Sequence, residues 1–187
     1  MSTNRDAGSD DSLLKEYNKL LFGVRRSIRY HNRRRLFFDR LHKISTFLSA
    51  LSGTATFASV LAKAGPFWTL TFAASVAVFS AADLVLNTSE KARLHHDFAR
   101  NFFELEKEMI KCENPSQEDI SRFTLRRLDI EAEEPPVLKV LDAICHNELL
   151  RALGYDRSYY ADIKWYQRLF ANFFDICEHK LEPGHGS

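Results

Sequence analysis

The sequence has little of what enzymes and secreted proteins usually carry. Its three cysteines, Cys112, Cys145 and Cys177, are far apart, odd in number and without C-x-x-C spacing, so no disulfide framework is expected and a reducing compartment suits them. It contains no glycine-rich phosphate loop, nucleophile elbow or paired-carboxylate signature. His95 and His96 are adjacent and would point in different directions on a helix. We therefore expect no metal, no cofactor and no enzymatic activity.

Strand patterns are missing as well, because no stretch alternates apolar and polar residues. Helical spacing begins near Leu13 and predicts a basic helix over 13–43 and another helix over 88–112. A C-terminal helical region over 116–181 follows, with a helix start at Ser116 and a helix end at Gly154. Its three helices are expected over 120–132, 136–154 and 158–181. Residues 1–12 are polar and expected to be disordered, and residues 182–187 form a loose tail. The predicted fold class is all-α.

Two apolar runs, 44–62 and 67–87, are joined by the hinge Lys63-Ala64-Gly65-Pro66. Each run is about 20 residues long, which is what a helix needs to cross the roughly 30 Å hydrocarbon core of a bilayer. Neither contains a charge before Asp83, so a soluble bundle with two buried core helices is the weaker alternative. We expect an integral membrane two-helix hairpin at 44–87. Its two long helices, each unbroken, should extend out of the membrane into a cytoplasmic helical stalk, in which the Leu13–Ile28 face packs on the helix after the hairpin.

Basic residues flank the hairpin. Those directly before the first run are candidate contacts to anionic lipid: Arg33, Arg34, Arg35, Arg40 and Lys43. The hinge carries only Lys63, so the positive-inside rule predicts a multi-pass protein of the inner membrane with both termini cytoplasmic. Arginines mixed with aromatics could also bind nucleic acid, but their place beside a membrane run favours lipid, and no nucleic acid partner is expected.

Small and hydroxylated residues recur every three or four positions along the first run: Ser45, Ser49, Ser52, Gly53, Thr56 and Ser59. A comparable seam on the second run consists of Ala73, Ala77, Ser80 and Ala81. Such seams let helices pack closely in lipid. The hydroxyl face could instead line a water path once several hairpins assemble.

Asp83 is the one ionisable residue inside a run, near its cytoplasmic end. Ionisable residues within membrane helices are functional candidates, so Asp83 could belong to a pore or its gate, or simply be solvated at the interface. Arg40 and Lys43 lie at similar depth on the first helix and could pair with it.

The layout resembles that of a known family. The segment RYHNRRRLFFDRLHK leads into the hairpin, and the aromatic-rich segment KARLHHDFARNFFELEKEM follows it. This arrangement, over Leu13 to Ile176, is similar to the SLATT domain, a two-transmembrane effector associated with SMODS nucleotidyltransferases and SLOG domains in bacterial conflict systems. The resemblance implies an effector that forms pores or disrupts the bilayer when a sensor partner is triggered, and so halts growth or kills the cell during phage infection.

The sequence thus predicts a homo-oligomeric, pore-forming effector in contact with membrane lipids, with a nucleotidyltransferase or another sensor as partner. The alternative is a non-conducting membrane scaffold or regulator that uses its cytoplasmic helices to bind proteins. A third hypothesis, a soluble nucleic-acid binder that uses the arginines of 25–40, fits the apolar runs least well.

Overall fold

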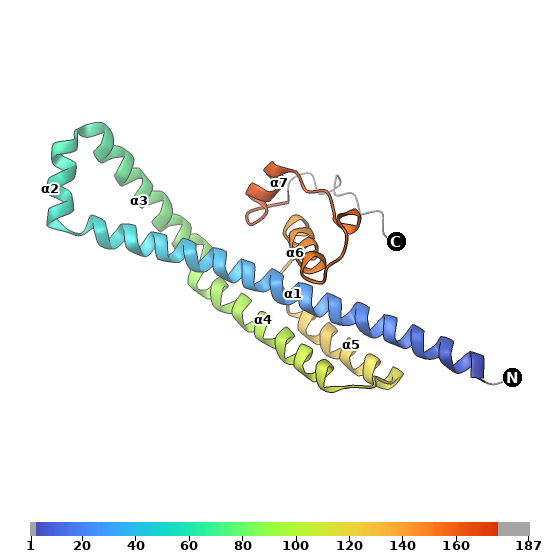
Figure 1. The fold of residues 1–187 in the computed structure, drawn as a ribbon. Coiled ribbons are helices and arrows are strands. Elements are labelled where there is room, and N and C mark those ends of the chain that lie inside the picture. Colours follow the sequence, from blue (N-terminus) through green and yellow to red (C-terminus); the bar gives the residue numbers. More distant parts are fainter. Residues whose placement is uncertain (1–2, 176–187) are drawn as a thin grey trace. The chain divides into compact units, whose positions relative to one another are not determined.

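The described part of the chain is mostly helical. The computed structural model describes residues 3–175, without the side chains of residues 3–10, 55 and 56, and it has no strand in that range. The helices are α1 (Thr3–Ser52), α2 (Ala55–Ala64), α3 (Pro66–Leu86), α4 (Thr88–Lys111), α5 (Gln117–Ala132), α6 (Lys139–Ala152) and α7 (Trp165–Phe170), with a short 3-10 helix η1 (Arg157–Tyr159) between α6 and α7 (Figure 1). The predicted all-α class is confirmed. α1 begins at Thr3 rather than near Leu13.

The chain divides into two compact units. The first consists of residues 1–32 and 97–187, and the second of residues 33–96. α1 and α4 contribute to both units. Most of the buried aromatic and aliphatic side chains lie in the first unit, and the two apolar runs lie in the second.

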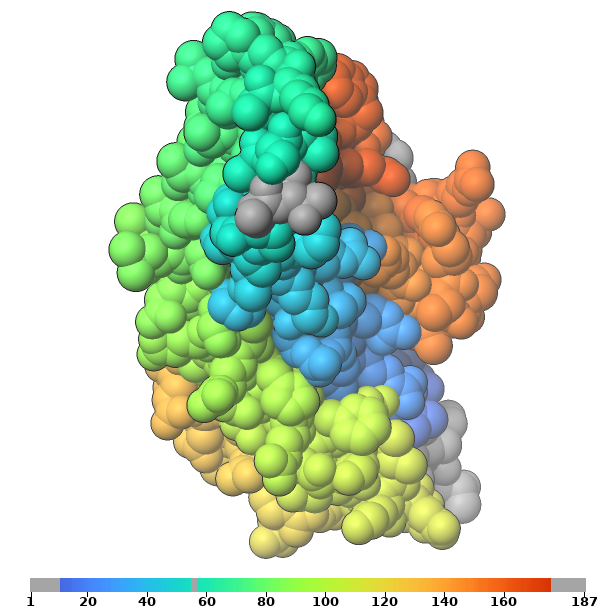
Figure 2. Space-filling model, turned by 90° about the vertical axis from the view of Figure 1, so that its left-hand side faces the viewer, coloured from blue at the N-terminus to red at the C-terminus, as the bar shows by residue number. Residues whose placement is uncertain are grey.

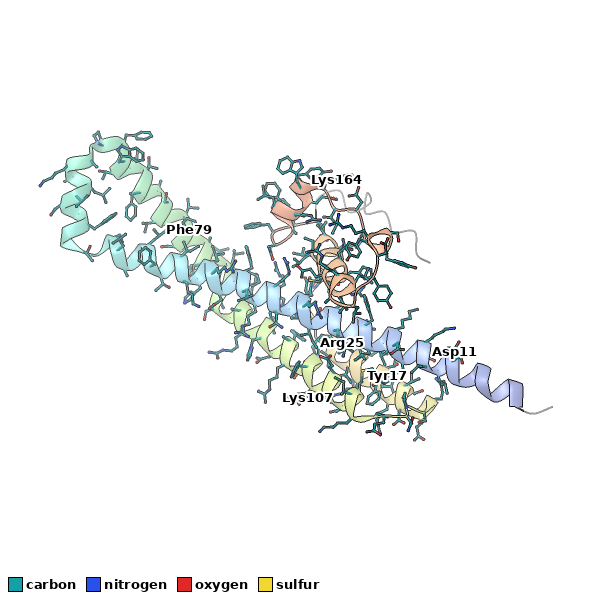
Figure 3. All side chains as sticks on the ribbon, in the orientation of Figure 1. Asp11, Tyr17, Arg25, Phe79, Lys107 and Lys164 are labelled. Carbon is teal, nitrogen blue, oxygen red and sulfur yellow. The ribbon has the colours of Figure 1, made fainter. Side chains whose placement is uncertain are left out.

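The first unit is built around a core between α1, α4 and α5. Its fully buried side chains include Val24, Phe102 and Met109. The Tyr17 hydroxyl donates a hydrogen bond to the Met109 carbonyl oxygen at 2.6 Å, and Arg25 Nε lies 2.6 Å from a Glu106 carboxylate oxygen; both Tyr17 and Arg25 are labelled in Figure 3. The predicted packing of the Leu13–Ile28 face against the helix after the hairpin is therefore confirmed.

Local signals set the ends of α5 and α6 as predicted. Ser116 and Asp119 form a capping box at the start of α5: the Asp119 N–H donates to the Ser116 hydroxyl oxygen and the Asp119 carboxylate accepts the Ser116 N–H. The hydrogen bonds from Ser116 hold the pKa of Asp119 below its usual range. α6 ends next to Gly154, whose φ of +80° favours glycine, and the Tyr155 N–H then reaches back to the Leu150 carbonyl.

The helix expected over 158–181 is wrong within the described residues. Residues 160–164 form no helix, and only α7 is helical after them within the described residues. The reason is a side chain from α6: Asn147 accepts a hydrogen bond from the Ala161 N–H at 2.9 Å and donates one to the Ala161 carbonyl at 2.8 Å. These two bonds occupy the backbone groups that a helix through Ala161 would need. Residues 176–181 of the expected helix lie outside the described residues.

Candidate functional site: the apolar hairpin

α3 carries most of the second unit's exposed apolar surface. Pro66 occupies its first turn, where the missing N–H of proline costs nothing, and its 21 residues span about 32 Å at 1.5 Å per residue. None of them is buried. Among the described residues, α3 is the one helix that is by itself long and apolar enough to cross a membrane. Figure 2 views the unit from its α2–α3 end, where α2 (teal) and α3 (green) form the surface.

The first apolar run is not one straight helix. α1 ends at Ser52, and α2 begins after Thr54 with its axis bent by 82° from that of α1. The expectation of an unbroken helix over 44–62 is therefore wrong. Thr54 has extended backbone, and its hydroxyl accepts the Phe57 N–H at 3.3 Å, so that it caps α2. Gly53 beside it disfavours a continuing helix by about 1 kcal/mol relative to alanine.

The break divides the predicted hydroxyl face between two helices. Ser45 is buried on α1, and the Ser49 and Ser80 hydroxyl oxygens lie 3.2 Å apart, which joins α1 to α3. The Ser52 hydroxyl donates to the Ser49 carbonyl of its own helix. Ser59 is exposed on α2.

The two remaining members of the predicted hydroxyl face are Gly53 and Thr56. Gly53 lies at the break itself, and a Cβ there would meet only the backbone of the preceding turn of α1. The Thr56 side chain lies outside the described residues.

Two pockets lie between the arms of the hairpin. One, of about 470 Å³, lies between the end of α1 and the base of α3. It is lined by Ser45, Thr46, Ser49, Ala50, Ser80, Asp83 and Leu84. The other, of about 480 Å³, lies between α2 and α3 and is mainly apolar, with Ala73 and Ala77 of the predicted seam among its lining residues. The first pocket therefore has four hydroxyl groups and the carboxylate of Asp83. The second is lined mostly by apolar side chains, with the hydroxyl groups of Ser52 and Thr69 among them.

Asp83 has different partners from those predicted. His42 Nδ1 lies 3.1 Å from each Asp83 carboxylate oxygen, and the buried Thr88 hydroxyl donates to the same carboxylate. Lys43 pairs instead with Asp39, one turn earlier on α1, at 2.7 Å, and Arg40 is exposed. The hydrogen bond from Lys43 lowers the pKa of Asp39. The predicted pairing of Asp83 with Arg40 or Lys43 is wrong.

Thr88 reaches Asp83 because the second long helix is also interrupted. Asn87 has left-handed backbone, φ 47° and ψ 55°, and it ends α3 with its N–H bonded to the Asp83 carbonyl. Asparagine tolerates this conformation better than most residues. The unbroken helix expected from Phe67 to residue 112 is therefore wrong, although an N–H from Lys91 to the Asn87 carbonyl resumes the helical pattern at once.

The basic residues before the hairpin contact protein groups as well as solvent. The Arg34 guanidinium lies over the ring of Phe38, 4.6 Å from its centroid, and Phe38 itself stacks on His95. An Arg35 nitrogen lies 3.0 Å from His96 Nδ1. Arg33 is half-buried. Part of this basic segment therefore holds α1 against α4 within the unit, a role that its charge pattern did not indicate.

No protein-family model, curated protein or solved structure matches the chain. Among the described residues, no group of three or more His, Cys, Asp or Glu side chains could hold a metal ion.

Proposed function

We propose that this protein is a membrane effector that oligomerises to form a pore, or otherwise permeabilises the inner membrane, in a bacterial anti-phage or conflict system. The observation that carries the proposal is the combination in one hairpin of an unburied apolar helix, α3, and a pocket with hydroxyl groups and one carboxylate.

The apolar surface of α3 supports insertion. Six of its large side chains are 62–83% exposed: Phe67, Trp68, Leu70, Val78, Leu84 and Val85. Complete burial of such a side chain is worth about 1.5–3 kcal/mol, so leaving six of them in water is unfavourable. The core helix of a soluble protein would bury them against its own fold, which α3 does not do. Lipid supplies the missing environment.

The break between α1 and α2, in the first arm of the hairpin, supports assembly of several hairpins around a water-filled path. Lipid-facing backbone must have its hydrogen bonds satisfied internally, and interrupted helices occur at membrane depth only where they face protein or a water-filled cavity. The interruption at Gly53–Thr54 lies within the apolar run, between α1 and α2. The end of α1 and α2 would together form the first membrane arm, as a broken span. α3 would form the second arm. Neighbouring hairpins would then cover the break and enclose the hydroxyl groups.

The charges that flank the hairpin support an orientation in the membrane, and the resemblance to SLATT domains supports a biological role. Basic residues before α2 and after α3 outnumber the single Lys63 at the hinge, which favours both termini in the cytoplasm. The likeness to SLATT domains favours a role in phage defence and a trigger from a nucleotidyltransferase or another sensor. The role proposed is non-enzymatic.

The test is leakage of a small dye from lipid vesicles that contain the purified protein. Ser49→Ala with Ser80→Ala removes the two hydroxyls that meet across the pocket while keeping small side chains. Because alanine preserves close packing but cannot bind water, we expect slower leakage at an unchanged oligomeric state. The matched control is Ser75→Ala, since the Ser75 hydroxyl bonds only to the Thr71 carbonyl of its own helix.

Two results would oppose the proposal. Equal leakage from the double variant and the Ser75→Ala control would reject this pocket as the water path. A protein that inserts but leaks at no protein-to-lipid ratio, in vesicles or in cells exposed to phage, would favour the non-conducting scaffold.

A further inference from the structure

The short helix α7 and the turn after it expose large apolar side chains and bury a glutamine. Ile163, Gln167 and Ala171 recur every four residues and are 6%, 1% and 1% exposed. On the opposite side, Trp165, Leu169 and Phe173 are 77%, 62% and 58% exposed. An ordinary surface helix buries its large apolar side chains and exposes its polar ones. Here a glutamine is inside and a tryptophan is outside, which indicates a surface made for an apolar environment.

The inward face is held by specific contacts. The Gln167 side-chain oxygen accepts the Lys164 N–H at 2.9 Å, which caps α7 and gives the buried amide oxygen a partner. Ile163 and Ala171 belong to the core cluster around Val140 and Leu141 of α6. The outward face therefore cannot turn inward without breaking this core.

Both ends of the segment are also tied to α6. Before α7, Asn147 binds the backbone of Ala161. After it, the Asp175 carboxylate accepts the Lys139 and Val140 N–H groups at 2.8 and 2.9 Å, which caps the start of α6. The exposed face is thus presented by a fixed platform, so binding would require little ordering of the chain.

The exposed area of this face is smaller than a stable dimer interface needs, and it suits a shallow contact. Trp165, Leu169, Phe170, Phe173 and Phe174 are its exposed large side chains. At about 150–250 Å² for a fully exposed aromatic side chain, they present roughly 500 Å². A standard protein interface takes about 800 Å² from each partner.

The residue types at this face fit the headgroup region of a bilayer. Lys164 and Arg168 are exposed beside Trp165, with Asp162 bonded to Lys164. Tryptophan with lysine and arginine is the combination enriched at membrane interfaces, where the ring enters the acyl boundary and the cations meet phosphates. Figure 3 labels Lys164 at the start of α7, among aromatic side chains drawn as sticks.

We propose that the exposed face of α7 binds the headgroup region of the bilayer, as a second, peripheral contact in addition to the hairpin. The proposal rests on the proposed function, because an inserted hairpin would anchor the chain, and α7 with it, to a bilayer. It gives the C-terminal helices a lipid-binding role.

The chain has two tryptophans, Trp165 in α7 and Trp68 in the hairpin. The proposed lipid contact of α7 can therefore be tested by tryptophan fluorescence. In the full-length Trp68→Phe protein, Trp165 reports on α7, and in the Trp165→Phe protein, Trp68 reports on the hairpin. Both are reconstituted in vesicles whose lipids are brominated near the headgroup or near the chain end. We expect Trp165 fluorescence to be quenched mainly by the shallow bromines and to shift to shorter wavelength when vesicles are added.

A matched pair of variants tests the face itself. In the Trp68→Phe background, Leu169→Ser should weaken quenching of Trp165, since it removes an apolar side chain from the face. Leu153→Ser should not, because Leu153 is similarly exposed but follows α6, away from α7 in sequence.

The outcomes separate the two proposals. Quenched Trp68 with unquenched Trp165 would overturn the α7 contact and leave the proposed function standing. Unquenched Trp68 would overturn the proposed function, whatever Trp165 does. If Trp165 is unquenched and Leu169→Ser dissociates an oligomer, a second copy of the chain occupies the face and the lipid contact is rejected.

Discussion

His42 Nδ1 lies 3.1 Å from both carboxylate oxygens of Asp83, and so connects the end of α1 to the base of α3. Asp83 also lines the pocket in which Ser49 meets Ser80. Asp83 therefore contacts His42, the residue directly before the predicted partner Lys43. That position is on the α1 face toward α3, whereas Lys43 is on the side of Asp39.

The His42–Asp83 pair should show measurable coupling. In a double-mutant cycle of His42→Ala and Asp83→Asn, we expect a coupling free energy of about 0.2–1 kcal/mol between the two side chains. The value is small because both side chains keep partial contact with solvent. The measurement is hydrogen exchange at the base of α3 in detergent. The comparison cycle replaces His42→Ala by Lys43→Ala and should give no coupling with Asp83. Equal coupling in the two cycles would contradict the geometry.

A second pair, buried in the first unit, should contribute more to stability. His31 is fully buried, stacks on Phe98 and Phe102, and its Nε2 lies 2.9 Å from a Glu134 carboxylate oxygen. Glu134→Ala should lower the opening free energy of α4 by about 1–3 kcal/mol, since it removes a partner from a buried polar group. Glu134→Gln keeps an acceptor and should lose less. No loss of opening free energy in Glu134→Ala would mean that this contact does not stabilise the unit.

Asn147 should be needed for the non-helical segment before α7. Asn147→Ala leaves the Ala161 N–H and carbonyl without the two bonds described above, which should cost about 1–3 kcal/mol of local stability. Hydrogen exchange and protease cleavage over residues 155–170 should both increase. Asn101→Ala, at an exposed position of α4, is the control and should change neither. Unchanged exchange in the Asn147 variant would show that Ala161 is held by other contacts.

Acidification should destabilise the first unit through His146. Burial, with the nearby Arg26 charge, lowers the pKa of His146 from 6.5, and Asp142 opposes this only in part. The folded state therefore favours neutral His146, so its contribution to stability is complete above pH 6.5 and is lost as pH falls through the lowered pKa. The slope cannot exceed about 1.4 kcal/mol per pH unit for one proton.

The measurement is the opening free energy of α6 by hydrogen exchange at several pH values between 8 and 5 in the natural protein and in His146→Gln. The difference between the two should grow as pH falls below 6.5. Burial raises the pKa of Asp142, so its own effect has the opposite sign, with stability gained as it takes up a proton. Because Asp142 is present in both proteins, this effect is subtracted in the difference between them. A difference that does not vary with pH would refute the assignment.

Some elements were predictable because their signals are local. The capping box of Ser116 and Asp119 needs only residues three apart, and the end of α6 needs only a glycine in the left-handed conformation. The packing of α1 on α4 followed from apolar residues at helical spacing. By contrast, the interruption at Asn87 was missed because an isolated asparagine in an apolar run is a weak signal. The Thr54 cap was missed because threonine is also common inside membrane helices.

The sequence by itself determined that the chain is helical, where its apolar runs lie, and where several helices begin or end, since these depend on periodicity and on side chains bonding to nearby backbone. Tertiary structure decided which groups meet. The partner of Asp83, the meeting of Ser49 with Ser80, the non-helical backbone at Ala161 and the outward-facing Trp165 all depend on residues far away in the sequence. No local pattern encodes such contacts, because they depend on how neighbouring helices are placed.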